Sequence, residues 1–145
     1  MKKANNIAVV GATGMVGQTF LKILEKNYFQ ESNINLLASS NSKGKEIVLR
    51  GQNHIVEDLD EFNFSNTDLA LFSAGSSVSS VYAPKAVSQG CVVVDNSSCF
   101  RYHYDIPLVV PEVNAHALDG YKLPGIIANP NCSTFQMLVA LKPIH

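Results

Sequence analysis

The feature that most constrains the fold is a glycine pattern between a short apolar run and an amphipathic segment. Residues 7–10 read Ile-Ala-Val-Val, a continuous run typical of a strand that is buried on both faces. Residues 11–17 read Gly-Ala-Thr-Gly-Met-Val-Gly, and apolar residues then recur at helical spacing as far as Leu24. A strand that leads through glycines into a helix predicts the first unit of a nucleotide-binding βαβ fold.

The three glycines of this turn, Gly11, Gly14 and Gly17, have spacing suited to a dinucleotide. Gly11 and Gly14 let the backbone turn tightly and approach a pyrophosphate, and Gly17 lets the helix pack closely on the strand. Unpaired N–H groups at the start of the helix attract phosphate. The alternative is a glycine-rich turn without a ligand, but the order of strand, glycines and helix favours binding.

Strands and helices are predicted to alternate along the rest of the chain. Buried strands are expected at residues 34–38, 69–72, 91–94, 108–110 and 126–128, with helices ending near residues 89 and 141. Two short runs at residues 46–49 and 54–57 predict a small hairpin or strand pair. Pro84 is unfavourable inside the second helix because it lacks an N–H group, and Gly90 is the expected C-terminal cap of that helix. This order predicts a Rossmann-like, doubly wound α/β fold, a mainly parallel sheet with helices on both faces.

Composition and charge narrow the classes of partner. The 145 residues fit one domain of ordinary size, and the net charge of -1 gives no reason to expect nucleic acid or an anionic membrane as a partner. The apolar run after the first lysines is too short for a signal sequence or a membrane span. The three cysteines and four histidines lack metal-ligand spacing, so no metal is expected. We expect a small-molecule partner and a reducing, cytoplasmic environment.

The segment after the second predicted strand bears on which dinucleotide would bind. NAD-selective sites place Asp or Glu there, roughly 20 residues past the glycines, to bind the ribose 2′-OH. Residues 38–43 read Ala-Ser-Ser-Asn-Ser-Lys and contain no carboxylate. Hydroxyls, an amide and the nearby Lys43 and Lys45 could hold a 2′-phosphate, so NADP is favoured over NAD. An ordinary solvated loop is the alternative.

A second chemical signal lies at residues 129–134, which read Asn-Pro-Asn-Cys-Ser-Thr where a strand ends and a helix begins. A thiol at Cys132 lies over backbone N–H groups without intrahelical partners, which favours the reactive thiolate over a merely buried cysteine. Cys91 opens an apolar strand and is interpreted as structural, whereas Cys99 stays undecided. Arg101, in a polar turn, could bind phosphate or carboxylate, or could be an ordinary surface arginine.

Five motifs occur together in one order, at residues 11–17, 72–75, 93–98, 109–114 and 129–134. In this order they resemble the aspartate-β-semialdehyde dehydrogenases, and the similarity spans nearly the whole chain. The related N-acetyl-glutamyl-phosphate reductases share the plan but carry a different sequence around their cysteine. The Asn-Pro-Asn-Cys-Ser-Thr motif favours the semialdehyde enzymes.

The resemblance implies roles for individual residues. Cys132 would be the acyl-thioester nucleophile, Asn131 an oxyanion or carbonyl contact, and Arg101 the phosphate-binding residue. The chain departs from the family at Asn41, where many members have arginine, and at Ser76-Ser77, where a second glycine is common. The cofactor contacts that the resemblance implies are Gly11, Thr13, Gly14, Met15, Val16, Gly17, Asn41, Ser42, Ser73 and Gly75.

The resemblance also implies a reaction and a domain plan. The reaction is the NADPH-dependent reductive dephosphorylation of L-4-aspartyl phosphate to L-aspartate 4-semialdehyde, in the aspartate pathway to diaminopimelate, lysine, threonine and methionine. Residues 1–131 would be the NAD(P)-binding domain, and residues 132–145 a cysteine-bearing helix leading into a second, catalytic and dimerisation domain absent from this chain. The parent would be a homodimer or a dimer of dimers, and the chain alone inactive. An NADP-binding module without thiol chemistry and a redox-sensing thiol protein stay open as alternatives.

Overall fold

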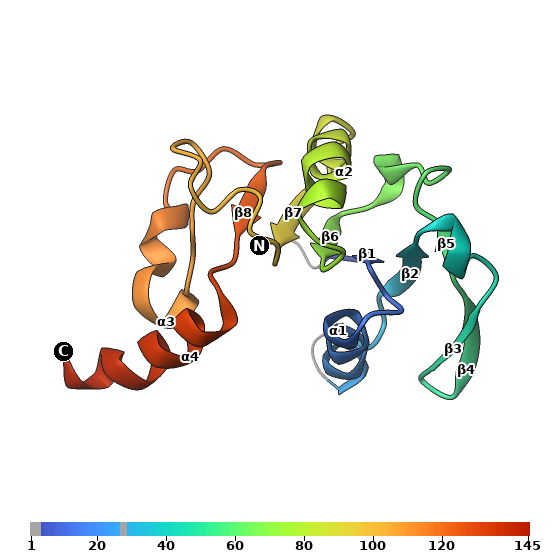
Figure 1. The fold of residues 1–145 in the computed structure, drawn as a ribbon, viewed down its shortest axis with the longest axis horizontal. Helices are drawn as coiled ribbons and strands as arrows, with labels where there is room; N and C mark the ends of the chain where they lie inside the picture. The colour runs from blue at the N-terminus through green and yellow to red at the C-terminus, as the bar shows by residue number, and fades with distance from the viewer. Residues whose placement is uncertain (1–3, 27–28) are drawn as a thin grey trace.

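The predicted parallel sheet is present in the structure, a computed structural model that describes residues 4–26 and 29–145. The strands of the main sheet lie in the order β5-β2-β1-β6-β7-β8, and every pairing is parallel (Figure 1). The strands are β1 (Asn6–Val10), β2 (Asn33–Ala38), β5 (Glu57–Asp58), β6 (Leu69–Phe72), β7 (Val92–Asp95) and β8 (Ile126–Ala128). The helices are α1 (Met15–Lys26), α2 (Ser76–Ser88), α3 (Pro111–Asn114) and α4 (Cys132–Leu141), with short 3-10 turns η1 (Ser40–Ser42), η2 (Phe64–Asn66), η3 (Ala115–Leu118) and η4 (Lys142–Ile144).

The central strand β1 supplies side chains to two cores, one on each face of the sheet. Ile7 and Val9 belong to the core under α1, whereas Ala8 and Val10 belong to the core under α2. All four residues are fully buried, and burying a side chain the size of valine or isoleucine stabilises the fold by about 1.5–3 kcal/mol. Figure 1 shows α1 and α2 on opposite sides of the sheet. The doubly wound α/β fold predicted from the sequence is confirmed.

The hairpin prediction was correct in its first strand and wrong in its second. β3 (Glu46–Leu49) pairs antiparallel with β4 (Gln52–Ile55), and Arg50 and Gly51 form a tight turn with φ of 54° and 73°. The hairpin ends before Val56, which is fully buried in the core under α1. Because Val56 takes the chain into the core, the residues after it form β5 at the edge of the main sheet.

Residues 108–110, predicted as a strand, form only an isolated bridge between Leu108 and Ala128. The bridge uses the Pro107 carbonyl and the Val109 N–H, which bond to Ala128 at 2.9 and 3.0 Å. The next bonds of a parallel ladder would need N–H groups at positions 111 and 130, and both residues are proline. Asn114 binds the backbone groups that face away from β8, accepting from the Val110 N–H at 2.8 Å and donating to the Leu108 carbonyl at 2.9 Å. Pro111 then begins α3, at a helix position where its missing N–H costs nothing.

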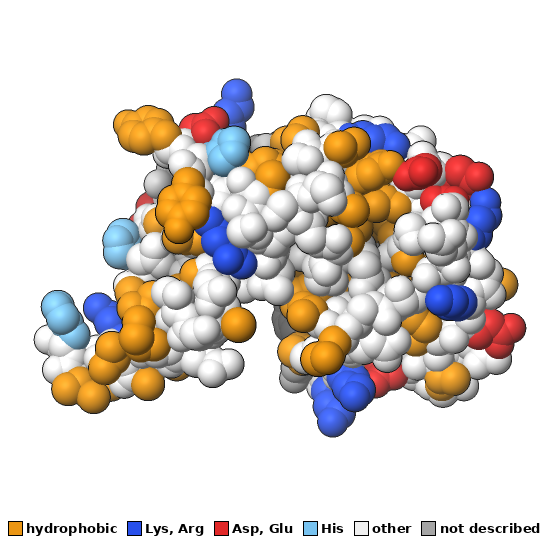
Figure 2. Space-filling model, viewed as in Figure 1, with side chains coloured by type: hydrophobic (Ala, Val, Ile, Leu, Met, Phe, Trp, Pro, Cys, Tyr) orange, Lys and Arg blue, Asp and Glu red, His pale blue; other side chains and the backbone are white. Residues whose placement is uncertain are grey.

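Helices α2 and α4 differ in how much of their surface is buried. α2 runs through Pro84, and Gly90 follows its end with φ of 94° and donates to the Val87 carbonyl, as expected of a glycine cap. α4 is rich in apolar residues, but none of its side chains is buried, and Met137 and Leu141 are 54% and 50% exposed. Figure 2 shows apolar side chains gathered on the surface beside the chain end. No helix within the described residues is long and apolar enough to cross a bilayer.

Candidate active site

The predicted site residues follow strands whose carboxyl ends are aligned. Val10 pairs in register with Leu37 on one side and with Phe72 on the other, Phe72 pairs with Asp95, and Asp95 pairs with Ala128. Because the strands are parallel, the segments that leave these residues emerge at one edge of the sheet. The chain reverses its winding direction between β1 and β6, which is where doubly wound sheets bind ligands.

The glycine turn after β1 is built by close backbone contacts. Gly11 has a φ of 86°, and the N–H groups of Gly11 and Ala12 both donate to the Leu37 carbonyl, at 2.8 and 3.1 Å. A Cβ on Gly17 would lie 2.2 Å from the Gly11 carbonyl oxygen, so no other residue fits without backbone movement. The role predicted for Gly17, close packing of helix on strand, is confirmed.

The surface beyond this turn is open. Gly14 donates to the Gly11 carbonyl at 3.0 Å, and α1 begins at the next residue. Met15 is 88% exposed, Val16 is 41% exposed, and Thr13 is half-buried. The first N–H groups of a helix lack intrahelical acceptors, so this turn can bind a phosphate group. The close contact at Gly17 keeps the start of α1 next to the turn.

The end of β6 supports the glycine turn. The Ser73 hydroxyl donates to the Val10 carbonyl at 3.0 Å, and a Cβ added to Gly11 would lie 2.9 Å from this hydroxyl oxygen. Ser73 is therefore committed to holding β1 and β6 together at the reversal point. Gly75, with φ of 93°, precedes the first residue of α2 and is exposed at the same edge.

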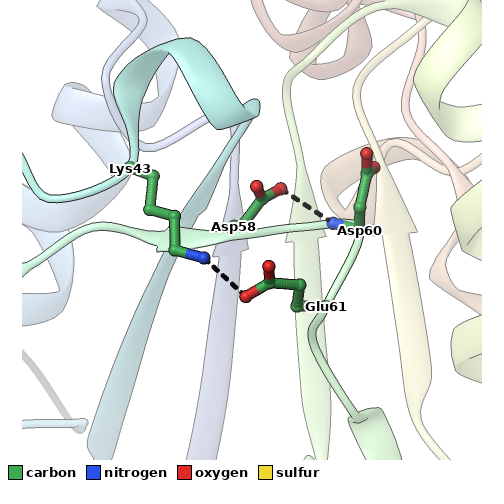
Figure 3. Close-up of polar contacts among 4 residues, drawn as sticks. All are labelled: Lys43, Asp58, Asp60 and Glu61. Carbon is green, nitrogen blue, oxygen red and sulfur yellow. Dashed lines mark hydrogen bonds and ion pairs between the residues drawn. The ribbon is translucent and has the colours of Figure 1, made fainter.

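The loop after β2 holds its two lysines differently. Lys45 Nζ donates to Ser42 Oγ at 3.2 Å beside the exposed Asn41. Lys43 Nζ lies 2.6 Å from Glu61 Oε2, and hydrogen bonding to that carboxylate raises the pKa of Lys43 (Figure 3). The predicted role of Lys43 beside a 2′-phosphate stays a prediction, and in this structure its ammonium is paired with Glu61.

A carboxylate from another part of the chain lies near the end of β2, although residues 38–43 contain none. Asp58 of β5 pairs in register with Ala38, the last residue of β2, and is 8% exposed. Its Oδ1 accepts a 3.1 Å hydrogen bond from the Asp60 N–H. The carboxylate comes from a neighbouring strand some way along the chain, so a search of the loop after β2 could not find it.

A buried carboxylate organises the loop after β7. Asp95 is fully buried, its Oδ1 accepts from Ser79 Oγ at 2.7 Å, and its Oδ2 accepts from Ser97 Oγ at 2.6 Å. Ser97 Oγ in turn accepts from the Cys99 N–H at 3.1 Å. Sequence reasoning identified the segment containing Asp95 and Ser97 but missed Ser79, whose sequence position gives no signal of the contact.

Three side chains join the ends of β7 and β8. Asn129 Nδ2 donates to Asn96 Oδ1 at 2.6 Å. Arg101 Nε donates to the Asn129 carbonyl at 2.9 Å, and its Nη2 donates to the Asn96 carbonyl at 3.0 Å. These bonds leave Nη1 and one hydrogen of Nη2 on the half-exposed Arg101 guanidinium to meet an anion. Neither asparagine was singled out from the sequence, although both lie in motifs that carried the resemblance.

Cys132 is the exposed first residue of α4. Asn131 caps this helix, because its Oδ1 accepts from the Ser133 N–H at 2.9 Å and from Ser133 Oγ at 3.0 Å. The Cys132 sulfur lies 3.9 Å from the same oxygen. With its oxygen used as the cap, the Asn131 side chain still has its Nδ2 amide hydrogens as donors.

The other two thiols are less accessible. Cys91 is fully buried, and burial raises the pKa of its thiol to about 12. Cys99 is half-buried, and burial together with the Asp95 carboxylate raises its pKa. The structural role predicted for Cys91 is confirmed by its burial, and of the three thiols Cys132 is the exposed one.

Comparison with known proteins identifies the family. The model of the semialdehyde dehydrogenase NAD binding domain matches residues 6–121. The aspartate-semialdehyde dehydrogenase of Legionella pneumophila is 59% identical over 145 residues, which is 100% of this chain and 42% of that protein. The crystal structure of aspartate semialdehyde dehydrogenase II complexed with ASA from Vibrio cholerae is 51% identical with a TM-score of 0.91, over 99% of this chain and 46% of that chain.

A more distant structure agrees. Aspartate semialdehyde dehydrogenase with NADP from Candida albicans is 32% identical with a TM-score of 0.81, over 98% of this chain and 47% of that chain. The chain thus spans less than half the length of the relatives it matches. The resemblance drawn from five short motifs is confirmed. The chain belongs to the semialdehyde dehydrogenase family and contains its NAD-binding domain.

Proposed function

We propose that this chain is the cofactor-binding and nucleophile-bearing part of an aspartate-semialdehyde dehydrogenase. Its reaction would be the NADPH-dependent reductive dephosphorylation of L-4-aspartyl phosphate to L-aspartate 4-semialdehyde. The observation that carries the proposal is the position of Cys132, exposed at the start of α4 and at the same sheet edge as the glycine turn. The relatives complexed with ASA and with NADP add support.

In this proposal Cys132 is the nucleophile. Its thiolate attacks the acyl carbon of the aspartyl phosphate, the carbon–sulfur bond forms, and the carbon–oxygen bond to phosphate breaks as phosphate leaves. NADPH, when bound, supplies the hydride that reduces the resulting thioester. Collapse of the reduced adduct returns the thiolate to Cys132 and releases the aldehyde.

Two neighbouring side chains have the donors that this chemistry needs. The Asn131 amide, whose oxygen caps α4, would donate to the carbonyl oxygen where negative charge develops. The remaining N–H groups of Arg101 would bind the phosphate group, while its other donors hold the ends of β7 and β8. Arg101 would thus act on the substrate from a fixed position.

For the cofactor we propose NADP in preference to NAD. The exposed turn at residues 13–16 would take the pyrophosphate, and Asn41, Ser42 and Lys45 would meet the 2′-phosphate. Gly75 would contribute at the start of α2, and Ser73 through its support of the glycine turn. The fit of a dinucleotide is supported by the tight approach of Gly17 to Gly11, which packs the start of α1 closely against the end of β1.

We also propose that residues 1–131 act as the cofactor-binding domain and that residues 132–145 lead into a second domain. The unburied apolar side chains of α4 support this division, since a helix of that composition is normally covered. The general acid or base would lie in that second domain, so we expect the chain alone to have at most trace dehydrogenase activity.

Two measurements on this chain test the proposal. Calorimetric titration with NADP and NAD tests the cofactor site. An electrophilic aspartate analogue, followed by peptide mass spectrometry, tests the nucleophile, and Cys132 is expected to be labelled well before Cys99 and Cys91. The matched control Cys132→Ser should abolish the fast adduct. NADP binding without preferential labelling of Cys132 would favour an NADP-binding module without thiol chemistry.

A further inference from the structure

We propose that Glu61 is a specificity-determining residue, because it holds the Lys43 ammonium away from the site of the cofactor 2′-phosphate. The inference rests on the proposed function, in which the loop after β2 meets that phosphate. It names a residue outside the loop as the one that limits the preference for NADP over NAD.

The Lys43 side chain leaves the loop after β2 and ends at a carboxylate. Lys43 directly follows η1, the turn that bears Asn41 and Ser42. Its Nζ lies 2.6 Å from Glu61 Oε2, and Figure 3 shows the side chain extending from the loop past Asp58 to reach it. The ammonium that sequence position would assign to the 2′-phosphate is therefore paired with a carboxylate.

The surroundings of the Lys43–Glu61 pair are mainly acidic. A pocket of about 530 Å³ at the edge of the sheet is lined by Lys43, Glu57, Asp58 and Glu61, with Ile55 and Phe62 as apolar neighbours. Three carboxylates thus share the pocket with one ammonium. Asp58 stands beside the end of β2 and adds a second attraction for the Lys43 charge. A dianionic phosphate must compete with these carboxylates for Lys43.

Lys45 differs from Lys43 in the partner of its ammonium group. Its Nζ donates to Ser42 Oγ at 3.2 Å and so remains on the loop proposed to meet the phosphate. The side chains of Lys43 and Glu61 are 49% and 70% exposed, and exposed ion pairs are weak. Removing the Glu61 charge should therefore release Lys43 to the phosphate without unfolding the chain.

The test measures dissociation constants of NADP and NAD by calorimetry for the unaltered 145-residue chain and four variants. We expect Glu61→Gln to tighten NADP binding about 3- to 10-fold and to change NAD binding less than about 2-fold. Lys43→Met alone should change the dissociation constant of NADP less than about 2-fold. In the double variant that combines Lys43→Met with Glu61→Gln, NADP should bind no more tightly than to the unaltered chain. The matched control Glu57→Gln removes an equal charge from the same pocket, and we expect it to change the dissociation constant of NADP less than about 2-fold.

Each other result counts against the inference. Unchanged or weaker NADP binding in Glu61→Gln overturns it, as does a gain that survives Lys43→Met or is matched by Glu57→Gln. If the unaltered chain binds NADP and only the variant effects are missing, the proposed function stands and this inference fails. If the unaltered chain binds neither dinucleotide, the cofactor proposal fails and this inference fails with it. Thermal denaturation of each variant checks that the fold is retained.

Discussion

Asn129 donates a 2.6 Å hydrogen bond from its Nδ2 to Asn96 Oδ1, and this bond joins the carboxyl ends of β7 and β8. The two residues are 33 positions apart in the chain. Asn129 lies three residues before Cys132, so the bond sets where the cysteine-bearing helix leaves the sheet. The backbone of Asn129 is held as well, because its N–H donates to the Asp95 carbonyl at 2.8 Å and its carbonyl accepts from Arg101.

Asn129→Ala should lower the free energy of unfolding by about 1–3 kcal/mol, because Asn96 Oδ1 loses its donor in a half-buried position. Urea denaturation at neutral pH measures the change. Asn53→Ala is the matched control, since its Nδ2 bonds to Glu46 on the exposed hairpin, and it should cost less than about 0.5 kcal/mol. Equal losses of unfolding free energy in the two variants would mean that the Asn96–Asn129 bond stabilises the fold no more than an exposed surface bond.

Gly17→Ala should destabilise the chain by about 3 kcal/mol or more, because the new Cβ would lie 2.2 Å from a backbone oxygen that cannot move independently. Gly14→Ala is the contrast, since its Cβ would lie 3.4 Å from the same Gly11 oxygen, and stability should change by less than about 1 kcal/mol. Thermal and urea denaturation measure both changes. If Gly14 approaches the cofactor pyrophosphate as proposed, Gly14→Ala should still weaken NADP binding in a stable chain.

Ser79→Ala should cost about 1.5–3 kcal/mol, because the fully buried Asp95 carboxylate would lose a 2.7 Å hydrogen bond to its Oδ1. Ser80→Ala changes the next residue of α2, an exposed serine whose hydroxyl bonds to the Ser77 carbonyl at 2.9 Å, and should cost less than about 0.5 kcal/mol. Denaturant unfolding of both variants under one condition gives the comparison. A Ser79 variant as stable as the Ser80 variant would contradict a structural role for the Asp95 network.

Cys91 should make stability fall at alkaline pH. Burial raises the pKa of its thiol from 9.0 to about 12. Below pH 9 the thiol is protonated in both states and contributes no pH dependence. Between pH 9 and 12 the unfolded chain loses the proton while the folded chain keeps it, so the unfolded state gains stability.

This ionisation should lower the free energy of unfolding by about 2 kcal/mol between pH 8 and pH 10.5. Urea denaturation at the two pH values should show a smaller fall in Cys91→Ala than in the unaltered chain. Cys99→Ala, at a half-buried thiol, should keep most of the fall. The same fall in the unaltered chain and in Cys91→Ala would show that Cys91 is not its source.

Local signals predicted much of the fold from the sequence. The bounds of β6 and β8 agree with the predicted strands, and α4 begins at Cys132 as predicted. These elements depend on apolar runs, on Asn131 as a helix cap and on glycine at tight turns, all of which act over a few residues. The strand predicted at residues 108–110 is reduced to one bridge, because positions 111 and 130, whose N–H groups would continue the ladder, are both proline.

The candidate site likewise contains residues that local sequence identifies and contacts that only the folded chain creates. Residue types and spacing were enough to single out the glycine turn and Cys132, because a helix start and a tight turn are local structures. Tertiary structure was needed to bring these pairs together: strand pairing for Asn129 with Asn96 and for Glu61 with Lys43, and packing of α2 on β7 for Ser79 with Asp95. Such contacts join residues 16 to 33 positions apart, so no local pattern encodes them. The charge that a 2′-phosphate would meet after β2 is therefore a property of the folded sheet edge, where β5 adds carboxylates that the neighbouring sequence lacks.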